Sequence, residues 1–140
     1  MSFLGEHKHT IDAKGRVFLP AKFREDEDQQ YVICRSFYNH EKCVCVYTEM
    51  EFENYKDKVV EDSKKSRRIV ERAMGAIASY VTPDSQGRLL LTQKLRSYAE
   101  LEKDVTIIGA GDHIEIWDTA NLDAVLDADM ELIMINDKDK

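Results

Sequence analysis

Cysteine is scarce in this sequence, and long apolar runs are missing. Three cysteines among 140 residues, an odd number, do not form a disulfide framework. No apolar stretch approaches the roughly 18–20 residues needed to cross a bilayer, and no N-terminal segment is organised like a secretory signal. We therefore expect a cytoplasmic protein with no membrane partner. Its length suits one compact domain, or two small halves that share a core.

Positive charge is in the minority, but it is unevenly distributed. The chain has 20 Lys and Arg against 27 Asp and Glu, which gives a net charge of −7. Residues 1–24 nevertheless carry +3 and residues 63–96 carry +6, which leaves −16 for the remainder. A phosphate backbone responds to the local field, so the overall acidity does not exclude a nucleic-acid partner.

The chain contains an internal duplication. Residues 9–24 align without a gap to residues 81–96, and seven of the sixteen positions are identical. Two apolar stretches typical of short strands follow in each half: 32–34, 44–47, 105–107 and 114–117. Each half thus reads as strand, turn, strand, short helix, strand, loop, strand, helix. This order predicts an α+β fold built from two tandem repeats.

The segment between the two halves has no counterpart at the start of the chain. Residues 63–80 place apolar side chains on one side of a helical wheel and basic ones on the other, which predicts a bridging amphipathic helix. Its basic side fits a solvated face as well as a nucleic-acid contact. We assign residues 1–62 to the first repeat and 81–133 to the second, and we expect the acidic tail 134–140 to be frayed.

Each half carries the motif Asp-x-x-Gly-Arg. Its members are Asp12, Gly15 and Arg16 in the first half, and Asp84, Gly87 and Arg88 in the second. An aspartate accepts hydrogen bonds from backbone N–H groups of its own turn, and glycine permits positive φ. The arginine can pair with the aspartate, which would orient its guanidinium. One such turn is a common hairpin composition, but two copies about a pseudo-twofold axis would place both arginines on one surface.

Further basic residues accompany both motifs. Four of them repeat between the halves, namely Lys22, Arg24, Lys94 and Arg96. Each is a candidate for phosphate contact or for an ion pair with the acidic segments, and for Arg24 we favour the ion pair because two acids follow it at once. Lys14 adds positive charge to the first turn, whereas Gln86 keeps only hydrogen bonding at the equivalent place. We therefore expect the first turn to dominate binding.

The paired motifs, together with Ile114-Glu115-Ile116-Trp117, closely resemble the MraZ family over roughly residues 1–126. The resemblance implies membership of the AbrB-like (SpoVT-AbrB) superfamily and a pseudo-twofold swapped-hairpin β-barrel with peripheral helices. It also implies a bacterial DNA-binding transcriptional regulator that is nucleoid-associated and assembles into a closed ring, often an octamer. Family members bind short direct repeats upstream of the division and cell-wall gene cluster, commonly as repressors.

The resemblance also assigns roles to residues. It makes Arg16 and Arg88 the first candidates for contact with double-stranded DNA and adds Lys14 as a phosphate or base contact. Asp12 and Asp84 would hold the two turns. Lys22 and Lys94, which repeat between the two halves, are further candidates for DNA binding.

Two other functions can be weighed from the residues. Asp12 and Asp84 allow a hydrolase with paired aspartates, but such a dyad shares one proton, and here each aspartate precedes an arginine that favours the ionised form. The second alternative is an architectural ring that only binds proteins. The cationic segments argue mildly against it. We predict that the protein is not an enzyme.

Metal and cofactor sites are not indicated by the spacing of their usual ligands. His7 and His9 alternate as on a strand, as do Cys43 and Cys45, and none of them has a strong zinc spacing. We therefore predict ordinary buried cysteines and no metal. Gly109-Ala110-Gly111 lacks the third glycine and the following helix of a dinucleotide-binding loop, so we predict a hairpin turn there and no cofactor.

Overall fold

The structure is a computed structural model of the chain that describes residues 2–24, 29–38 and 41–134. Its strands are β1 (Glu6–Thr10), β2 (Arg16–Phe18), β3 (Tyr31–Arg35), β4 (Val44–Thr48), β5 (Ser79–Val81), β6 (Arg88–Leu90), β7 (Asp104–Gly109) and β8 (Ile114–Asp118). Its helices are the 3₁₀ helix η1 (Ala21–Phe23), α1 (Glu49–Ser63), α2 (Arg67–Ile77), α3 (Gln93–Tyr98) and α4 (Thr119–Ile133). This element order confirms the predicted α+β class.

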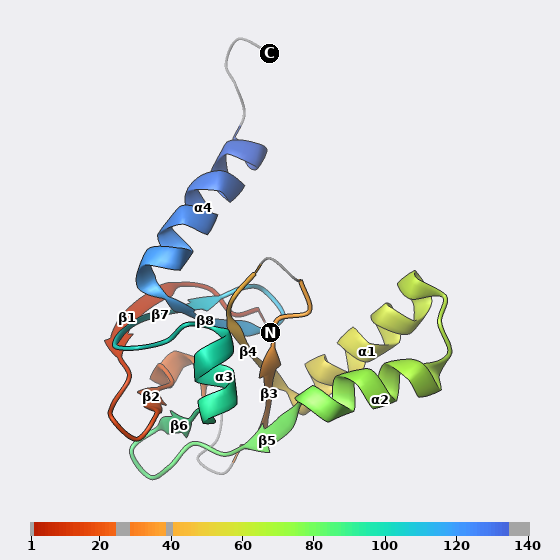
Figure 1. Cartoon of the computed structure of the whole chain (residues 1–140), viewed down its shortest axis with the longest axis horizontal. Coiled ribbons are helices and arrows are strands. Elements are labelled where there is room, and N and C mark those ends of the chain that lie inside the picture. Colours follow the sequence, from red (N-terminus) through yellow and green to blue (C-terminus); the bar gives the residue numbers. More distant parts are fainter. Residues whose placement is uncertain (1, 25–28, 39–40, 135–140) are drawn as a thin grey trace.

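The strands pair across the two halves of the chain. A six-stranded antiparallel sheet has the order β1-β7-β8-β4-β3-β5, and β2 and β6 form a separate two-stranded ribbon (Figure 1). Four pairings join one half to the other: β1 with β7, β5 with β3, β4 with β8, and β2 with β6. The closed barrel is not confirmed. In the described part of the chain the sheet is open, with β1 and β5 as its edges, because β2 and β6 pair with each other instead of closing it.

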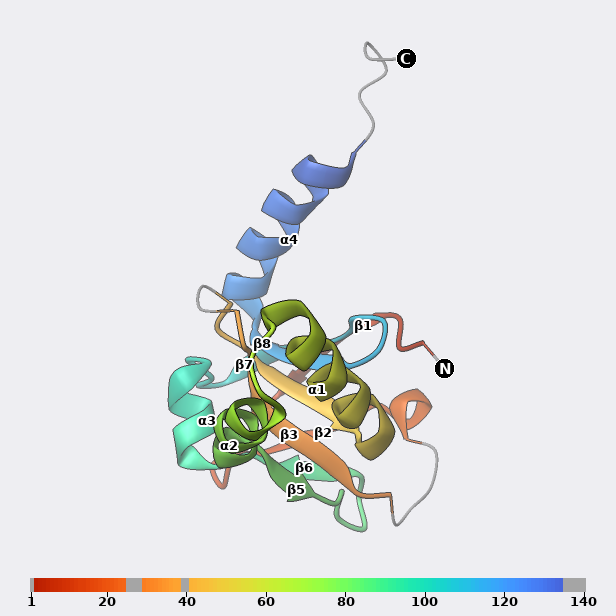
Figure 2. The same cartoon turned by 90° about the vertical axis from the view of Figure 1, so that its right-hand side faces the viewer.

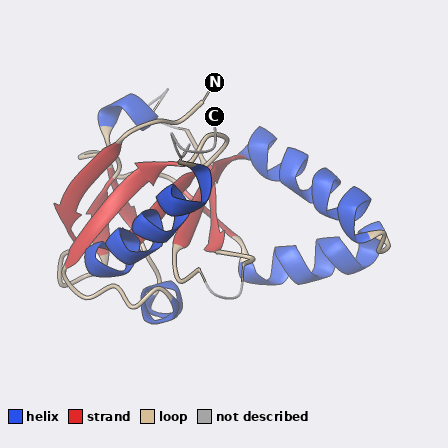
Figure 3. Ribbon diagram, turned by 90° about the horizontal axis from the view of Figure 1, so that it is seen from above, coloured by secondary structure: helices blue, strands red, loops and turns tan. Residues whose placement is uncertain are grey.

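Each face of the sheet is covered by its own apolar core. On one face, Val17 of β2 and Leu89 of β6 pack with sheet residues such as Ile107 and Ile116. On the other face, side chains of α1, α2 and α4 form a second cluster with Trp117 and other sheet residues. The helical hairpin α1–α2 extends to one side of the body, and α4 projects away from it (Figures 2 and 3). The ribbon therefore has one side packed on the core and the other side facing away from it.

Helix starts follow the sequence signals. The Thr48 side chain caps α1 by accepting from the backbone N–H of Glu51, and Thr92 caps α3 in the same way, each at 3.2 Å. The bridging helix is shorter than predicted. It begins after its cap Ser66 and ends at Ile77, because residues 79–81 are drawn into the sheet as β5, beside β3.

None of the described helices is both long enough and apolar enough to span a membrane. The predicted fraying of the tail concerns residues that, apart from Met134, lie outside the described part of the chain.

Candidate nucleic-acid interface

Each Asp-x-x-Gly-Arg motif forms a tight turn that its aspartate closes. In the first turn, Asp12 Oδ1 accepts from the backbone N–H groups of Lys14 at 3.0 Å and Arg16 at 2.9 Å. The second turn repeats this arrangement around Asp84, which accepts from the backbone N–H of Arg88 at 2.9 Å. The two turns thus have the same hydrogen bonds, although the residues around them differ.

These hydrogen bonds keep both carboxylates ionised. The backbone N–H of Arg16 is the main cause of the lowered pKa of Asp12, and the arginine side chain adds to it. The backbone N–H of Arg88 lowers the pKa of Asp84 in the same way. Neither aspartate is held as the proton donor that a hydrolytic dyad needs, so the geometry argues against the paired-aspartate hydrolase.

The glycines of the two turns meet the opposite half of the chain. Gly15 and Gly87 have φ values of +87° and +81°, as expected from their place in the motif. A Cβ atom at Gly15 would lie 2.7 Å from Arg96 Nε, and one at Gly87 would lie 2.7 Å from Arg24 Cζ. Each of these arginines also donates from Nε to the carbonyl five residues before it, at 3.0 Å for Arg24 and 3.2 Å for Arg96.

Arg24 and Arg96 therefore brace the turns, a role that the sequence analysis missed. Their equal spacing from the two motif arginines was the available signal. The two acids expected to pair with Arg24 lie outside the described residues.

The motif arginines are fixed at one end and open at the other. Arg16 Nε donates to Asp12 Oδ2 at 2.7 Å, and Arg88 Nε donates to Asp84 Oδ2 at 2.8 Å. Arg88 Nη1 also lies 3.9 Å from Asp12 Oδ2, which links the two motifs. The side chains of Arg16 and Arg88 are 30% and 20% exposed. Apart from this contact of Arg88 Nη1, each aspartate engages Nε, so the terminal guanidinium nitrogens keep N–H groups that can donate to a ligand.

The ribbon brings both arginines onto one surface. In the β2–β6 register, Arg16 lies opposite Leu90, and Phe18 lies opposite Arg88. These four side chains point outward, because the residue between them on each strand is buried. Phe18 is 43% exposed and Leu90 is 57% exposed. We call the surface made by Arg16, Phe18, Arg88 and Leu90 the ribbon face. Phe18 and Leu90 were not among the predicted site residues, although strict alternation from the arginines places them here.

The predicted lysines lie at different distances from the turns. Lys14 is exposed within the first turn itself. Lys94 is exposed in α3, two residues before the bracing Arg96. Lys22 is exposed on η1, and its Nζ lies 5.5 Å from the centre of the Phe23 ring. A Cβ at Gly5 would also meet Lys22 Nζ, so the contacts of Lys22 are with the start of the chain and not with a turn.

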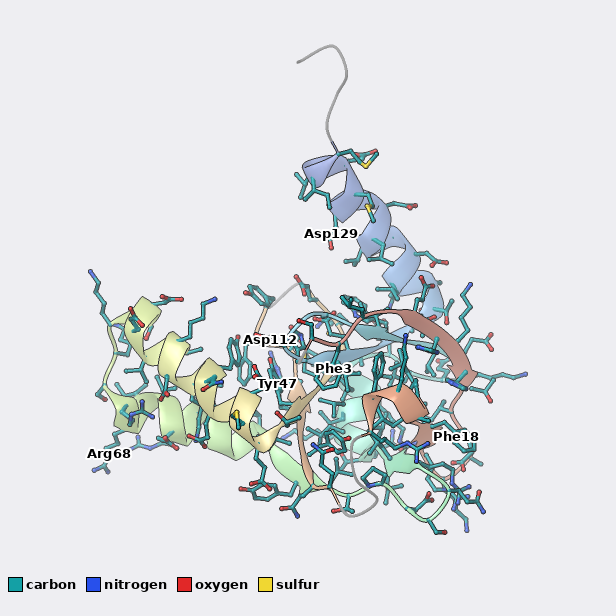
Figure 4. All side chains as sticks on the ribbon, turned by 180° about the vertical axis from the view of Figure 1, so that it is seen from behind. Phe3, Phe18, Tyr47, Arg68, Asp112 and Asp129 are labelled. Carbon is teal, nitrogen blue, oxygen red and sulfur yellow. The ribbon has the colours of Figure 1, made fainter. Side chains whose placement is uncertain are left out.

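The basic side of α2 lies apart from the ribbon face. Arg67 pairs with Asp57 of α1 and, at 3.4 Å, with Glu71. Figure 4 shows Arg68 at the end of the helical hairpin, on the opposite side of the molecule from Phe18. The structure therefore does not bring α2 and the ribbon into one basic surface.

Two other features of the sequence find their place in the structure. Gly109 ends β7, and Ala110 and Gly111 lie in the turn of the β7–β8 hairpin, where the N–H of Ala110 donates to the carbonyl of His113 at 2.8 Å. This confirms the predicted hairpin turn. Among the described residues, one group of side chains could hold a metal ion, namely Cys43, Cys45 and Glu115.

Comparison with known proteins decides the family. The family model described as MraZ protein matches residues 2–73 and 74–139. The chain belongs to the MraZ family. The transcriptional regulator MraZ of Carboxydothermus hydrogenoformans is 38% identical over 117 residues, which cover 82% of this chain and 80% of that protein. The MraZ protein of Acetivibrio thermocellus is 41% identical over 118 residues, with 83% and 80% covered. That of Clavibacter michiganensis subsp. michiganensis is 38% identical over 128 residues, with 90% and 87% covered.

These MraZ relatives are named as transcriptional regulators and not as enzymes. The prediction that the chain is not an enzyme is thereby confirmed.

Proposed function

We propose that this chain is a DNA-binding transcriptional regulator that inserts its ribbon face into the major groove. A two-stranded ribbon fits that groove, and a guanidinium can bind guanine O6 and N7 with two hydrogen bonds, worth about 1–3 kcal/mol of discrimination. The observation that carries the proposal is the placement of Arg16 and Arg88 on one ribbon, each held through Nε by its own aspartate. A guanidinium fixed in this way loses little freedom on binding.

The neighbouring residues support this role. The two turns are organised by Asp12, Gly15, Asp84 and Gly87. Apolar surface for thymine methyl groups is supplied by Phe18 and Leu90. Lys14, Lys22 and Lys94 are assigned to phosphate, which fixes the register of the protein on the duplex. The first turn dominates, because Lys14 has no charged equivalent in the second.

The proposal extends to the target and the assembly. The targets are short tandem repeats upstream of the division and cell-wall gene cluster, and binding there represses transcription in the nucleoid of the cytoplasm. Each chain forms one swapped-hairpin unit from repeats 1–62 and 81–133, joined by 63–80, and the strand pairings between the halves support this. Copies form a closed ring, an octamer, so that neighbouring protomers engage neighbouring repeats.

Such multivalency raises the affinity by a factor of about 10²–10⁴ without new kinds of contact. A small ribbon face on an acidic chain needs this gain. Assembly is supported by an exposed apolar end of α4. Its residues are Met130, Leu132 and Ile133, and the exposed Met134 follows directly. Apolar side chains gathered in this way commonly mark interaction surfaces.

An electrophoretic mobility-shift experiment on the DNA upstream of the gene for this protein tests the proposal. Arg16→Ala should abolish the shift, while gel filtration shows the same assembly as for the wild type. Arg68→Ala is the matched control, because it removes an exposed arginine far from the ribbon face, and it should shift DNA normally. Normal binding by Arg16→Ala, or equal losses in both variants, would show that the site is wrongly assigned.

Footprinting separates the regulator from the architectural alternative. A regulator protects a defined set of repeats in the upstream DNA, and the protection disappears in Arg16→Ala. A purely architectural ring protects no defined sequence, so an even cleavage pattern would favour that alternative.

A further inference from the structure

A group of two thiols and a carboxylate lies on the face of the sheet opposite to the ribbon. Cys45 lies in β4, and Cys43 comes two residues before it, so strand alternation places both thiols on the same side. Glu115 of β8 stands directly opposite Cys45. The two Sγ atoms are 4.0 Å apart, and both lie within 4.8 Å of a carboxylate oxygen of Glu115.

This geometry suits a tetrahedral ion with thiolate ligands. Zinc–sulfur bonds of about 2.3 Å place two sulfur ligands about 3.8 Å apart in a tetrahedron. Thiolates select zinc over the hard ions magnesium and calcium, and a carboxylate is a common third ligand. We propose that Cys43, Cys45 and Glu115 bind one zinc ion. On binding, two S–Zn bonds and one O–Zn bond form, and the two thiol protons are released to solvent.

The carboxylate of Glu115 is already oriented by its neighbours. Its Oε1 accepts from Trp117 Nε1 at 2.9 Å, and its Oε2 is 2.8 Å from His113 Nε2. His113 is in turn held by Asp112 at 2.7 Å and stacks on the ring of Tyr47. Each carboxylate oxygen has a second lone pair, so the ion can bind without breaking these bonds. Partners of this kind orient metal ligands and raise metal affinity.

A cavity provides access to the group. It has a volume of about 220 Å³, and Cys45, His113 and Glu115 contribute to its wall. Figure 4 shows Tyr47 and Asp112, which also line it, in the region between the helical hairpin and the sheet. The fourth position of the ion can therefore be filled by water from the cavity. The site is separate from the ribbon face, so it stands independently of the proposed DNA binding.

Zinc titration of the full chain tests the proposal. The protein is first stripped with a chelator, and Zn²⁺ is then added against a chromogenic competitor, with elemental analysis giving the stoichiometry. We expect one zinc ion per chain. Replacement by Co²⁺ should give a thiolate-to-cobalt charge-transfer band and the intense visible spectrum of a tetrahedral site. No zinc uptake by the folded wild type, or a cobalt spectrum without the thiolate band, would overturn the proposal.

Variants identify the ligands. Cys43→Ala, Cys45→Ala and Glu115→Gln should each weaken zinc binding by at least about 100-fold, since outer partners alone contribute about 10–100-fold. Cys34→Ala is the matched control. Cys34 is a buried cysteine that pairs with Cys45 across the strands but lies outside the group, so its loss should leave zinc binding unchanged. A loss in Cys34→Ala equal to that in Cys43→Ala would refute this ligand set.

A milder variant covers the case in which the buried cysteine variants do not fold. Trp117→Phe keeps an aromatic ring in the core and removes the indole N–H that donates to Glu115 together with part of the ring system, so zinc should bind about 10-fold more weakly with an unchanged cobalt spectrum. Unchanged zinc affinity in both Trp117→Phe and Glu115→Gln would exclude Glu115 as a ligand. Arg16→Ala should bind zinc like the wild type, which separates this site from the ribbon face.

Discussion

Arg96 lies against Gly15 of the opposite half of the chain, where a Cβ atom would come within 2.7 Å of Arg96 Nε. The same relationship holds between Arg24 and Gly87. Each half thus supplies an arginine that supports the turn of the other half. Because the turns carry Arg16 and Arg88, the position of the ribbon face depends on contacts between the halves as well as within them.

Gly15→Ala should destabilise the protein. A side chain at φ +87° is strained by about 1–3 kcal/mol, and its Cβ would also come 2.9 Å from the carbonyl oxygen of Leu91. Gly75→Ala is the control, because Gly75 lies within α2 with open space around it, and it should stabilise by up to about 1 kcal/mol. Urea unfolding of both variants measures the difference. Equal midpoints for the two variants would contradict the proposed strain.

Lys94→Ala and Arg96→Ala should affect DNA binding in different ways. Loss of a phosphate contact at Lys94 weakens binding to all sequences and reduces the slope of log K against log salt by about 1. Arg96 supports a turn, so Arg96→Ala should lower the free energy of unfolding and weaken binding with nearly the wild-type slope. Binding titrations at several salt concentrations measure both. A reduced slope in Arg96→Ala would indicate that this arginine contacts phosphate itself.

Acid should destabilise the two turns. The folded pKa values of Asp12 and Asp84 lie below those of the unfolded chain, so the unfolded state binds more protons as the pH falls. Their contribution to stability is complete above the unfolded pKa of about 3.9 and is lost as the pH drops through the folded values. Unfolding measured from neutral pH down into this range should therefore show a smaller acid-induced loss in the Asp12→Asn, Asp84→Asn double variant. An identical pH dependence would mean that other carboxylates control it.

Phe18→Ala should separate recognition from stability. Phe18 is 43% exposed, so its loss should lower the free energy of unfolding much less than loss of a fully buried core side chain. Binding to the cognate repeats should fall by about tenfold, equivalent to about 1.4 kcal/mol. Leu89→Ala is the opposite case, since Leu89 is fully buried and its loss should cost about 2–5 kcal/mol of stability. Wild-type affinity in a folded Phe18→Ala would remove Phe18 from the interface.

Local features of the structure were predictable from the sequence. The aspartate-closed turns, the positive φ of Gly15, the caps Thr48 and Thr92, and the strands of each half follow from short-range hydrogen bonding and alternation. These signals act over a few residues, and the duplication showed the aspartate-closed turn and its glycine twice.

Features that depend on distant pairing were not predictable in this way. The open sheet and the end of α2 follow from which strands pair and in which register. The meeting of Cys45 with Glu115 requires β4 to lie beside β8, and no spacing within either strand indicates it. The repeated spacing of Arg24 marks it as a candidate, but its contact with Gly87 depends on a turn in the other half of the chain.

The interleaved strands also bear on how the two repeats can diverge. If each repeat were a separate polypeptide, β2 could meet β6 only when two molecules collided, and the interface would dissolve on dilution. Covalent linkage makes that meeting intramolecular and independent of concentration. Covalent linkage also means that the two repeats need not be identical, so one turn can carry a lysine where the other carries glutamine. A protein with a symmetric backbone can then present two different turns to an asymmetric DNA sequence.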